Sequence, residues 1–337
     1  MTATEQAPLK RADFKTDQEV RWCPGCGDYA ILSSFQKVFP KLGIERENFA
    51  VISGIGCSSR FPYYMNTYGF HTIHGRAPTI ATGLKLANPD LSVWVITGDG
   101  DGLSIGGNHL IHAIRRNVDL KIVLFNNQIY GLTKGQFSPT SEFGKRTKST
   151  PHGSIDTPFK PLSLILGANP SFVARTIDRN PKHMGTIFER AGHWSGNAFV
   201  EVYQNCNIFN DGAFFHLTEK ETKKEQVVEL THGEPLIFGA NDDKAIMIEG
   251  FSPKVVLLAD VDRDSLPVHD EQGPIAYHSM LAQMNAEGGF PTPVGVIRAV
   301  KRPVYDELAI AQIETAREKT GKVSIFDELL KGDTWTV

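Results

Sequence analysis

The stretch from Gly98 to Asn127, GDGDGLSIGGNHLIHAIRRNVDLKIVLFNN, decides the fold. It follows a short apolar, β-branched run at 91–97 (LSVWVIT) and contains a second such run at 120–125 (LKIVLF). Both runs are typical of strands buried in a parallel sheet. Between them, apolar residues recur at helical spacing and predict a crossover helix over 105–116. The stretch therefore predicts a βαβ unit of an α/β fold.

Polar residues follow each of these predicted strands. In open parallel sheets, ligands bind beyond the carboxyl ends of the strands, and both Asp99 and Asn127 fall at such ends. A carboxylate and an amide carbonyl are oxygen ligands of the kind that Mg²⁺ prefers, with phosphate and water completing its shell. A glycine-rich turn is often only a turn, but this one opens a helix whose N-terminus favours anions. The stretch therefore predicts a magnesium and diphosphate site.

Composition and charge limit the classes of function. The chain has 337 residues, of which 41% are hydrophobic, and a formal net charge of −3. This composition predicts a folded protein without the basic surface that nucleic acids require. The N-terminal region has no apolar signal core, and no run approaches the roughly 20 apolar residues of a membrane span. We therefore expect a cytoplasmic protein that contacts neither nucleic acid nor membrane.

The sequence changes character near residue 217, where a charge-dense run (LTEKETKKEQVVEL, 217–230) begins. Such runs usually form a solvated helix or a linker. We therefore predict a boundary here, between a main domain over 1–216 and a C-terminal extension of unknown role over 217–337. The extension is predicted to contain three short strands and then a helix, at 235–239 (PLIFG), 245–250 (AIMIEG), 254–260 (KVVLLAD) and 275–284 (IAYHSMLAQM).

Four cysteines are present, and each falls in a predicted loop or at the end of a predicted element. Cys23 and Cys26 form a C-x-x-C pair on a Pro-Gly turn, whereas Cys57 and Cys206 are isolated. In a cytoplasmic chain such a pair indicates metal or redox chemistry rather than a disulfide. The residues alone leave three interpretations open: inert thiols, a tetrahedral Zn site, or an iron–sulfur cluster. Zn ribbons usually have two paired knuckles, so one pair with two isolated cysteines favours a cluster.

Several motifs together resemble a known family. The Gly-Asp-Gly turn followed by an Asn pair resembles the signature of thiamine diphosphate enzymes. Over a region between about residue 20 and residue 216, the chain is similar to the beta subunits of 2-oxoacid:ferredoxin oxidoreductases, particularly the 2-oxoglutarate type. The motifs that carry the resemblance are WCPGCGDY (22–29), GIGCSSR (54–60), HTIHGRAPTIATGLKLA (71–87), GDGDGLSIGGNH (98–109), NNQIYGLTKGQFSPTS (126–141) and QNCNIFNDG (204–212).

The resemblance implies a fold and two inorganic sites. The fold is a thiamine diphosphate-binding fold, in which a mostly parallel sheet has helices on both faces and a C-terminal extension is added. In this family the 1–216 domain holds the diphosphate half of the cofactor and one [4Fe-4S] cluster. The implied cluster ligands are Cys23, Cys26, Cys57 and Cys206.

The same resemblance implies contacts to the cofactor. Asp99, Asn127 and the backbone carbonyl of Ile129 are expected to bind Mg²⁺. The residues expected to contact thiamine diphosphate are Ile55, Gly56, Cys57, Ser58, His74, Gly100, Asp101, Gly131, Leu132, Thr133, Lys134, Gly135 and Gln136.

Three residues are predicted to act in catalysis: Arg60, Leu132 and Lys134. An arginine beside the cofactor can pair bidentately with the distal carboxylate of 2-oxoglutarate, which pyruvate lacks. Lys134 lies in a loop, GLTKGQ (131–136), that is predicted to close over the diphosphate. It either holds a substrate carboxylate or phosphate, or is a solvated lysine.

The roles of some acids and histidines stay open. Asp101 either contacts the diphosphate through its backbone or faces solvent. Family position favours His74 over His71 as a residue at the cofactor. The two histidines of the predicted crossover helix are expected to be structural, and they are His109 and His112.

The leading functional hypothesis is the catalytic beta subunit of a 2-oxoglutarate:ferredoxin oxidoreductase. It would convert 2-oxoglutarate and coenzyme A to succinyl-CoA and CO₂, or catalyse the reverse reaction, and pass electrons through the cluster to ferredoxin. The resemblance places a required glutamate on a partner alpha subunit, so an α₂β₂ assembly is expected. Three alternatives are a beta subunit for pyruvate or another 2-oxoacid, a non-redox thiamine enzyme with a Zn site, and an electron-transfer or scaffold subunit without catalysis.

Overall fold

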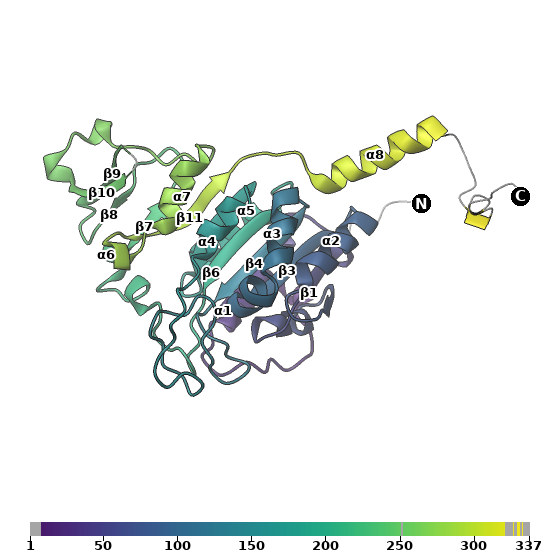
Figure 1. Cartoon of the computed structure of the whole chain (residues 1–337), viewed down its shortest axis with the longest axis horizontal. Coiled ribbons are helices and arrows are strands. Elements are labelled where there is room, and N and C mark those ends of the chain that lie inside the picture. The colour runs from purple at the N-terminus through teal and green to yellow at the C-terminus, as the bar shows by residue number, and fades with distance from the viewer. Residues whose placement is uncertain (1–7, 251, 321–325, 327–328, 331, 333–337) are drawn as a thin grey trace, which may run out of the picture.

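An eight-stranded sheet forms the centre of the molecule (Figure 1). The computed structural model describes residues 8–250, 252–320, 326, 329, 330 and 332. In spatial order the strands are β2 (Tyr68–His71), β1 (Phe49–Ser53), β3 (Ser92–Gly98), β4 (Leu120–Asn126), β6 (Ala198–Tyr203), β5 (Phe172–Ile177), β11 (Thr292–Ala299) and β7 (Val227–Leu230). The strands from β2 to β5 are mutually parallel, and β11 and β7 run in the opposite direction.

Helices cover both faces of this sheet, as predicted. The strand side chains alternate between two apolar cores: in β4, Val123 and Phe125 lie in one core, whereas Ile122 and Leu124 lie in the other. The first core is completed by α1 (Asp28–Val38) and α5 (Pro181–Gly192). The second core is completed by α2 (Ala77–Ala87), α3 (Gly107–Arg116), α4 (Pro161–Gly167) and α7 (Ile275–Gln283). The predicted α/β fold class is therefore confirmed.

The βαβ unit predicted from the Gly98–Asn127 stretch is present as β3, α3 and β4. Both strands lie within one residue of their predicted bounds. The helix begins at Gly107, two residues later than predicted, because Asp101–Ile105 forms a π-helical turn before it. Such wide turns are frequent at functional sites.

The region after residue 217 takes part in the central sheet. The charge-dense run was expected to be a solvated helix or linker, and this is wrong for its last residues, Val227–Leu230, which form β7. Val228 and Leu230 are buried there, so apolar packing outweighs the charged flank. Because β7 and β11 join the main sheet, strands from both sides of the predicted boundary at 216/217 belong to one sheet.

The three short strands and the helix that were predicted in the extension are present, whereas its other elements were not predicted. A separate three-stranded antiparallel sheet contains β8 (Ile237–Phe238), β9 (Lys244–Glu249) and β10 (Ser252–Leu257). The predicted helix is α7, and a short α6 (Lys223–Gln226) precedes β7. The final long helix is α8 (Tyr305–Thr320), which extends away from the body of the molecule (Figure 1). Among the described residues, no helix is both long enough and apolar enough to cross a membrane.

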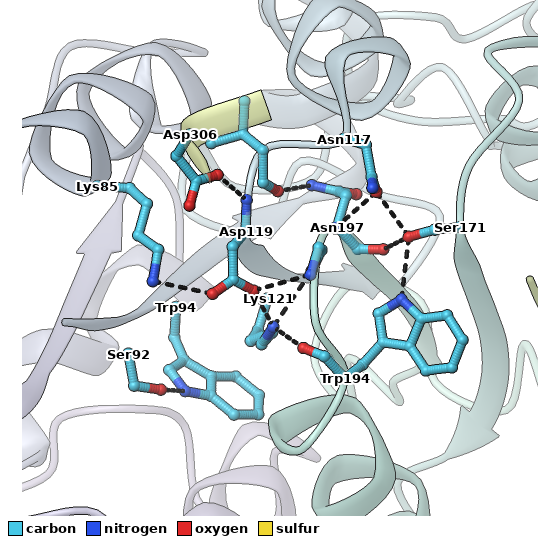
Figure 2. Close-up of polar contacts among 12 residues, drawn as sticks. Lys85, Ser92, Trp94, Asn117, Asp119, Lys121, Ser171, Trp194, Asn197 and Asp306 are labelled. Atoms are coloured by element: carbon cyan, nitrogen blue, oxygen red, sulfur yellow. Dashed lines mark hydrogen bonds and ion pairs between the residues drawn. The ribbon is translucent and has the colours of Figure 1, made fainter. Parts of the chain in front are cut away.

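A buried ionic network lies at the amino-terminal end of the parallel strands (Figure 2). Asp119 lies between Lys85, whose ammonium is 2.8 Å from its carboxylate, and Lys121, which also contacts it. Both lysine side chains are almost fully buried. The backbone N–H of Asp119 donates to Asp306 at the start of α8, at 2.9 Å. This network therefore links α2, β4 and α8 at the end of the sheet where the parallel strands begin.

Candidate functional site

Loops at the carboxyl ends of four neighbouring strands carry most of the predicted site residues. Cys57, Asp99, Asn127 and Cys206 follow β1, β3, β4 and β6 within a few residues. The register pairs Gly98 with Phe125 across β3 and β4, so the two loops start side by side. The parallel topology therefore gathers these groups at one edge, where open α/β sheets bind their ligands.

One cavity at this edge, of about 110 Å³, is lined by most of the residues predicted to contact thiamine diphosphate. We refer to it as the cofactor cavity. The predicted residues that line it are 55–58, His74, 99–101, Asn127, Ile129 and 131–133. The predicted contacts Lys134, Gly135 and Gln136 do not line it, and Lys134 lines the neighbouring cavity instead.

Asp99 is held in place by two hydroxyl groups. Its Oδ2 accepts hydrogen bonds from Ser138 Oγ and Thr140 Oγ1, each at 2.5 Å. Thr140 also contacts the amide oxygen of Asn126 at 3.0 Å. Burial raises the pKa of Asp99 to about 6, and the two hydroxyls oppose that shift. The carboxylate is therefore oriented in advance, as second-layer hydrogen bonds orient metal ligands. Neither hydroxyl was predicted from the sequence, although the motif 126–141 contains both.

Asp101 does not face solvent, so one of the two predictions made for it is wrong. It is 2% exposed, and its Oδ1 accepts from the backbone N–H of Ile55 at 3.1 Å and of Gly75 at 2.7 Å. The same oxygen lies 2.6 Å from His74 Nδ1, while Oδ2 accepts from Thr97. The Asp101 carboxylate therefore joins three loops and orients His74 at the cofactor cavity.

Glycine is required at two positions of this site for packing reasons. A Cβ on Gly54 would lie 2.0 Å from the carboxylate of Asp101, and one on Gly100 would lie 2.1 Å from the ring of Tyr130. Tyr130 also donates its hydroxyl to the carbonyl of Gly100 at 3.0 Å. These glycines therefore allow the loops to approach one another closely.

The other histidines lie away from the cofactor cavity. His71 Nδ1 is 2.9 Å from Ser53 Oγ, and burial lowers the pKa of this imidazole. His109 and His112 lie on α3, and neither lines the cofactor cavity.

All four cysteines line a second cavity, of about 210 Å³. We refer to it as the cysteine cavity. Burial raises the pKa of Cys57 to about 12 and also raises that of Cys26. Arg60 and Lys134, which were predicted to act on the substrate, also line this cavity.

The donor set of the cysteine cavity fits a polynuclear cluster. Around one Zn²⁺, bonds of about 2.3 Å would draw four sulfurs together without open space between them. Among the described residues, no three Cys, His, Asp or Glu side chains are close enough to hold a single ion. Four cysteines that line one cavity supply the number and type of ligands that a Cys₄-bound [4Fe-4S] cluster would need.

A buried acid also lines the cysteine cavity. Asp28 is 1% exposed, and its carboxylate lies beside the thiol of Cys26. Burial, followed by repulsion from Asp178, raises the pKa of this carboxyl to about 7, and the hydrogen bond from Cys26 opposes that shift. No pattern in the sequence assigned a role to Asp28.

The cofactor cavity and the cysteine cavity share a wall. Four residues line both cavities: Cys57, Asn127, Gly131 and Leu132. A Cβ on Gly131 would lie 3.5 Å from the sulfurs of both Cys57 and Cys206, so its backbone packs against them. A single layer of residues therefore separates the two cavities.

The loop that was predicted to close over the diphosphate is exposed at 132–134 and half-buried at 131, 135 and 136. Lys134 adopts a left-handed backbone conformation, with φ of 74°. This conformation is uncommon for residues other than glycine, and it recurs at functional sites. Leu132 is 49% exposed while lining both cavities, so the loop forms the outer rim of the site.

Comparison with known proteins identifies the family. The family model of the C-terminal thiamine pyrophosphate-binding domain of thiamine pyrophosphate enzymes matches residues 54–202. The chain is 54% identical over 337 residues to the 2-oxoglutarate oxidoreductase subunit KorB of Mycobacterium tuberculosis, covering 99% of this chain and 90% of that one. It is 44% identical over 200 residues to the beta subunit of 2-oxoacid:ferredoxin oxidoreductase 1 of Aeropyrum pernix, covering 59% of this chain and 63% of that one.

A solved structure is also similar along the whole chain. It is the 2-oxoglutarate:ferredoxin oxidoreductase of Magnetococcus marinus with 2-oxoglutarate, coenzyme A and succinyl-CoA bound. The TM-score is 0.77 at 31% identity, and the match covers 98% of both chains. The chain therefore belongs to the family of beta subunits of thiamine diphosphate-dependent 2-oxoacid:ferredoxin oxidoreductases.

Proposed function

We propose that this beta subunit catalyses the coenzyme A-dependent oxidative decarboxylation of 2-oxoglutarate, or its reverse, and passes the electrons to ferredoxin. The observation that carries the proposal is the shared wall between the cofactor cavity and the cysteine cavity. An enzyme that only decarboxylates needs the first cavity. An enzyme that also exports electrons needs an acceptor beside the first cavity, and the second cavity supplies the place for it.

The residues of this chain have distinct tasks in the proposed reaction. Asp99, Asn127 and the carbonyl of Ile129 hold Mg²⁺, which binds the diphosphate of the cofactor. Thiamine diphosphate, when bound, would supply a nucleophilic carbon and an electron sink. The four cysteines would hold one [4Fe-4S] cluster, whose chemistry would be one-electron transfer.

Two cationic side chains, Arg60 and Lys134, line the cysteine cavity. Arg60 donates to the backbone carbonyl of Arg21 at 3.3 Å and is only partly exposed, so its guanidinium is held near the sulfurs. We propose that Arg60 and Lys134 stabilise the negative charge of the cluster and, at the rim shared with Leu132, orient the substrate carboxylate.

A partner subunit completes the proposed site. Large apolar side chains are exposed beside the cofactor cavity, including Ile55 at 41% and Ile73 at 79%. Exposed apolar surface of this kind marks interaction sites. We propose that an alpha subunit covers it, supplies the glutamate that activates the aminopyrimidine ring, and assembles with this chain as α₂β₂.

The names of similar proteins support 2-oxoglutarate as the proposed substrate. The M. tuberculosis relative and the M. marinus structure are both named for 2-oxoglutarate, and the latter contains coenzyme A. The test is reduction of ferredoxin by the anaerobically co-purified αβ complex, with 2-oxoglutarate, pyruvate or a branched 2-oxoacid. The expected result is coenzyme A-dependent reduction that is fastest with 2-oxoglutarate. Decarboxylation without ferredoxin reduction would contradict the proposal, and a preference for pyruvate would refute the substrate assignment.

A further inference from the structure

Gln204 lies between the two cavities. It follows directly after β6, and the register pairs Asn126 with Tyr203, so the next residues, Asn127 and Gln204, are neighbours. The backbone N–H of Gln204 donates to the carbonyl of Asn126 at 2.9 Å and fixes this arrangement. The side chain is 1% exposed and lines the cysteine cavity.

The side-chain amide of Gln204 bonds to both sites. Its Nε2 donates to Cys26 Sγ at 3.3 Å and to the carbonyl of Asn205 at 2.6 Å. Its Oε1 accepts from Asn127 Nδ2 at 2.9 Å. Both N–H donors and the carbonyl of this amide are therefore in use.

The hydrogen-bond partners of Gln204 and Asn127 determine which way the oxygen and nitrogen of each side-chain amide point. The backbone carbonyl of Asn205 can only accept, so the nitrogen of Gln204 must face it and the oxygen must face Asn127. Asn127 then presents its nitrogen to Gln204 and its Oδ1 to the opposite side. There Oδ1 accepts from the backbone N–H of Ile129 at 3.2 Å and keeps a second lone pair free.

We propose that Gln204 is a positioning residue that couples the two cofactor sites, an inference that rests on the function proposed above. It turns Asn127 so that Oδ1 faces Mg²⁺, and it donates an N–H to the sulfur of Cys26. Hydrogen bonds to cluster sulfurs raise the reduction potential, because the donor stabilises the added electron. Oriented metal ligands bind their ion more tightly.

The test compares two variants in the anaerobically co-purified complex. Gln204→Met removes both the donor and the acceptor, whereas Gln204→Glu keeps an oxygen facing Asn127 and removes the amide donor. The matched control is Gln36→Met, since Gln36 is also buried but donates only to the carbonyl of Tyr64. The readouts are the cluster potential, from an EPR-monitored redox titration, and the Mg²⁺ concentration that half-saturates thiamine diphosphate binding.

The expected results separate the two roles. Gln204→Met shifts the potential to more negative values and raises the half-saturating Mg²⁺ concentration by about 10-fold or more. Gln204→Glu shifts the potential in the same direction with a much smaller change in the Mg²⁺ requirement, and Gln36→Met changes neither. If the cluster potential and the half-saturating Mg²⁺ concentration of Gln204→Met both equalled the wild-type values, the inference would be overturned. A wild-type complex that lacks the cluster would instead refute the proposed function.

Discussion

At the scale of single residues, patterns in the sequence predicted candidate ligands that the structure brings together, but they did not predict the groups that orient those residues. Asp99 and Asn127 could be predicted because each directly follows a buried strand, and the two strands are neighbours. Ser138 and Thr140 could not be assigned, because a loop of irregular path brings them back to Asp99 and no periodicity describes that path. Gln204 could not be assigned either, because its proposed role depends on the order of strands in the sheet. The spacing of residues in the sequence does not reveal that order.

Thr140→Val should weaken Mg²⁺ binding. The substitution preserves shape but removes one of the two hydroxyls that hold the Asp99 carboxylate. The concentration of Mg²⁺ needed for half-maximal thiamine diphosphate binding should rise by about 10- to 100-fold, as for other oriented ligands. Isothermal titration of the αβ complex measures this. Thr186→Val on the exposed side of α5 is the control, and an equal response of both variants would refute the role of Thr140.

Asp119→Asn should destabilise the protein strongly. The change leaves Lys85 and Lys121 buried without their shared carboxylate (Figure 2). Removal of one partner from a buried ionic network costs about 3 kcal/mol or more in the free energy of unfolding. Glu249→Gln breaks the exposed pair with Lys254 and should cost less than about 1 kcal/mol. Urea unfolding of both variants measures the difference, and equal losses would contradict the account.

At the scale of elements, the apolar pattern predicted some of the strands and helices, whereas core elements such as α1, α5 and β5 were not predicted. β3, β4, α7 and the small sheet of β8 to β10 all fall close to their expected positions. β7 was missed because charged residues dominate the run that contains it, and only burial of two apolar residues makes it a strand. The reversed direction of β11 relative to β5 depends on how the chain returns to the sheet, and no local signal predicts that.

The contact of α7 with β11 should make stability depend on pH. His278 on α7 accepts from the guanidinium of Arg298 on β11 at 3.1 Å and lies 2.9 Å from the carbonyl of Asp270. His269 is likewise buried between Tyr277 and the carbonyl of Val296. Burial lowers the pKa of both histidines, so the folded protein binds protons at these positions less readily than the unfolded chain does.

Below the ordinary histidine pKa of about 6.5, the unfolded chain binds protons at these positions more readily than the folded chain does. The free energy of unfolding should therefore be fully retained above that pH and fall as the pH decreases from about 7 towards 5. His278→Asn should make this fall less steep, whereas substitution of the exposed His152 should leave the slope unchanged. Chemical unfolding at several pH values measures it, and an unchanged slope in His278→Asn would refute the explanation.

At the scale of the whole molecule, the sheet brings the cofactor cavity and the cysteine cavity to one edge and leaves that edge open. Ile55 and Leu132 are exposed although they line the cofactor cavity, so the chain alone does not enclose its cofactor. The isolated chain should therefore bind thiamine diphosphate much more weakly than the αβ complex and show no turnover. Calorimetry and ferredoxin reduction on both samples check this, and full turnover by the isolated chain would contradict it.

The most direct measurement is the metal and sulfide content of the anaerobically co-purified complex, combined with EPR after reduction. The central claim is that this chain holds a four-iron cluster in the cysteine cavity, one layer of residues away from the thiamine diphosphate site. The account predicts about four irons and four sulfides per beta chain and an EPR signal from a reduced cluster. A complex that contains one Zn²⁺ per beta chain, with no iron and no EPR signal, would contradict the account.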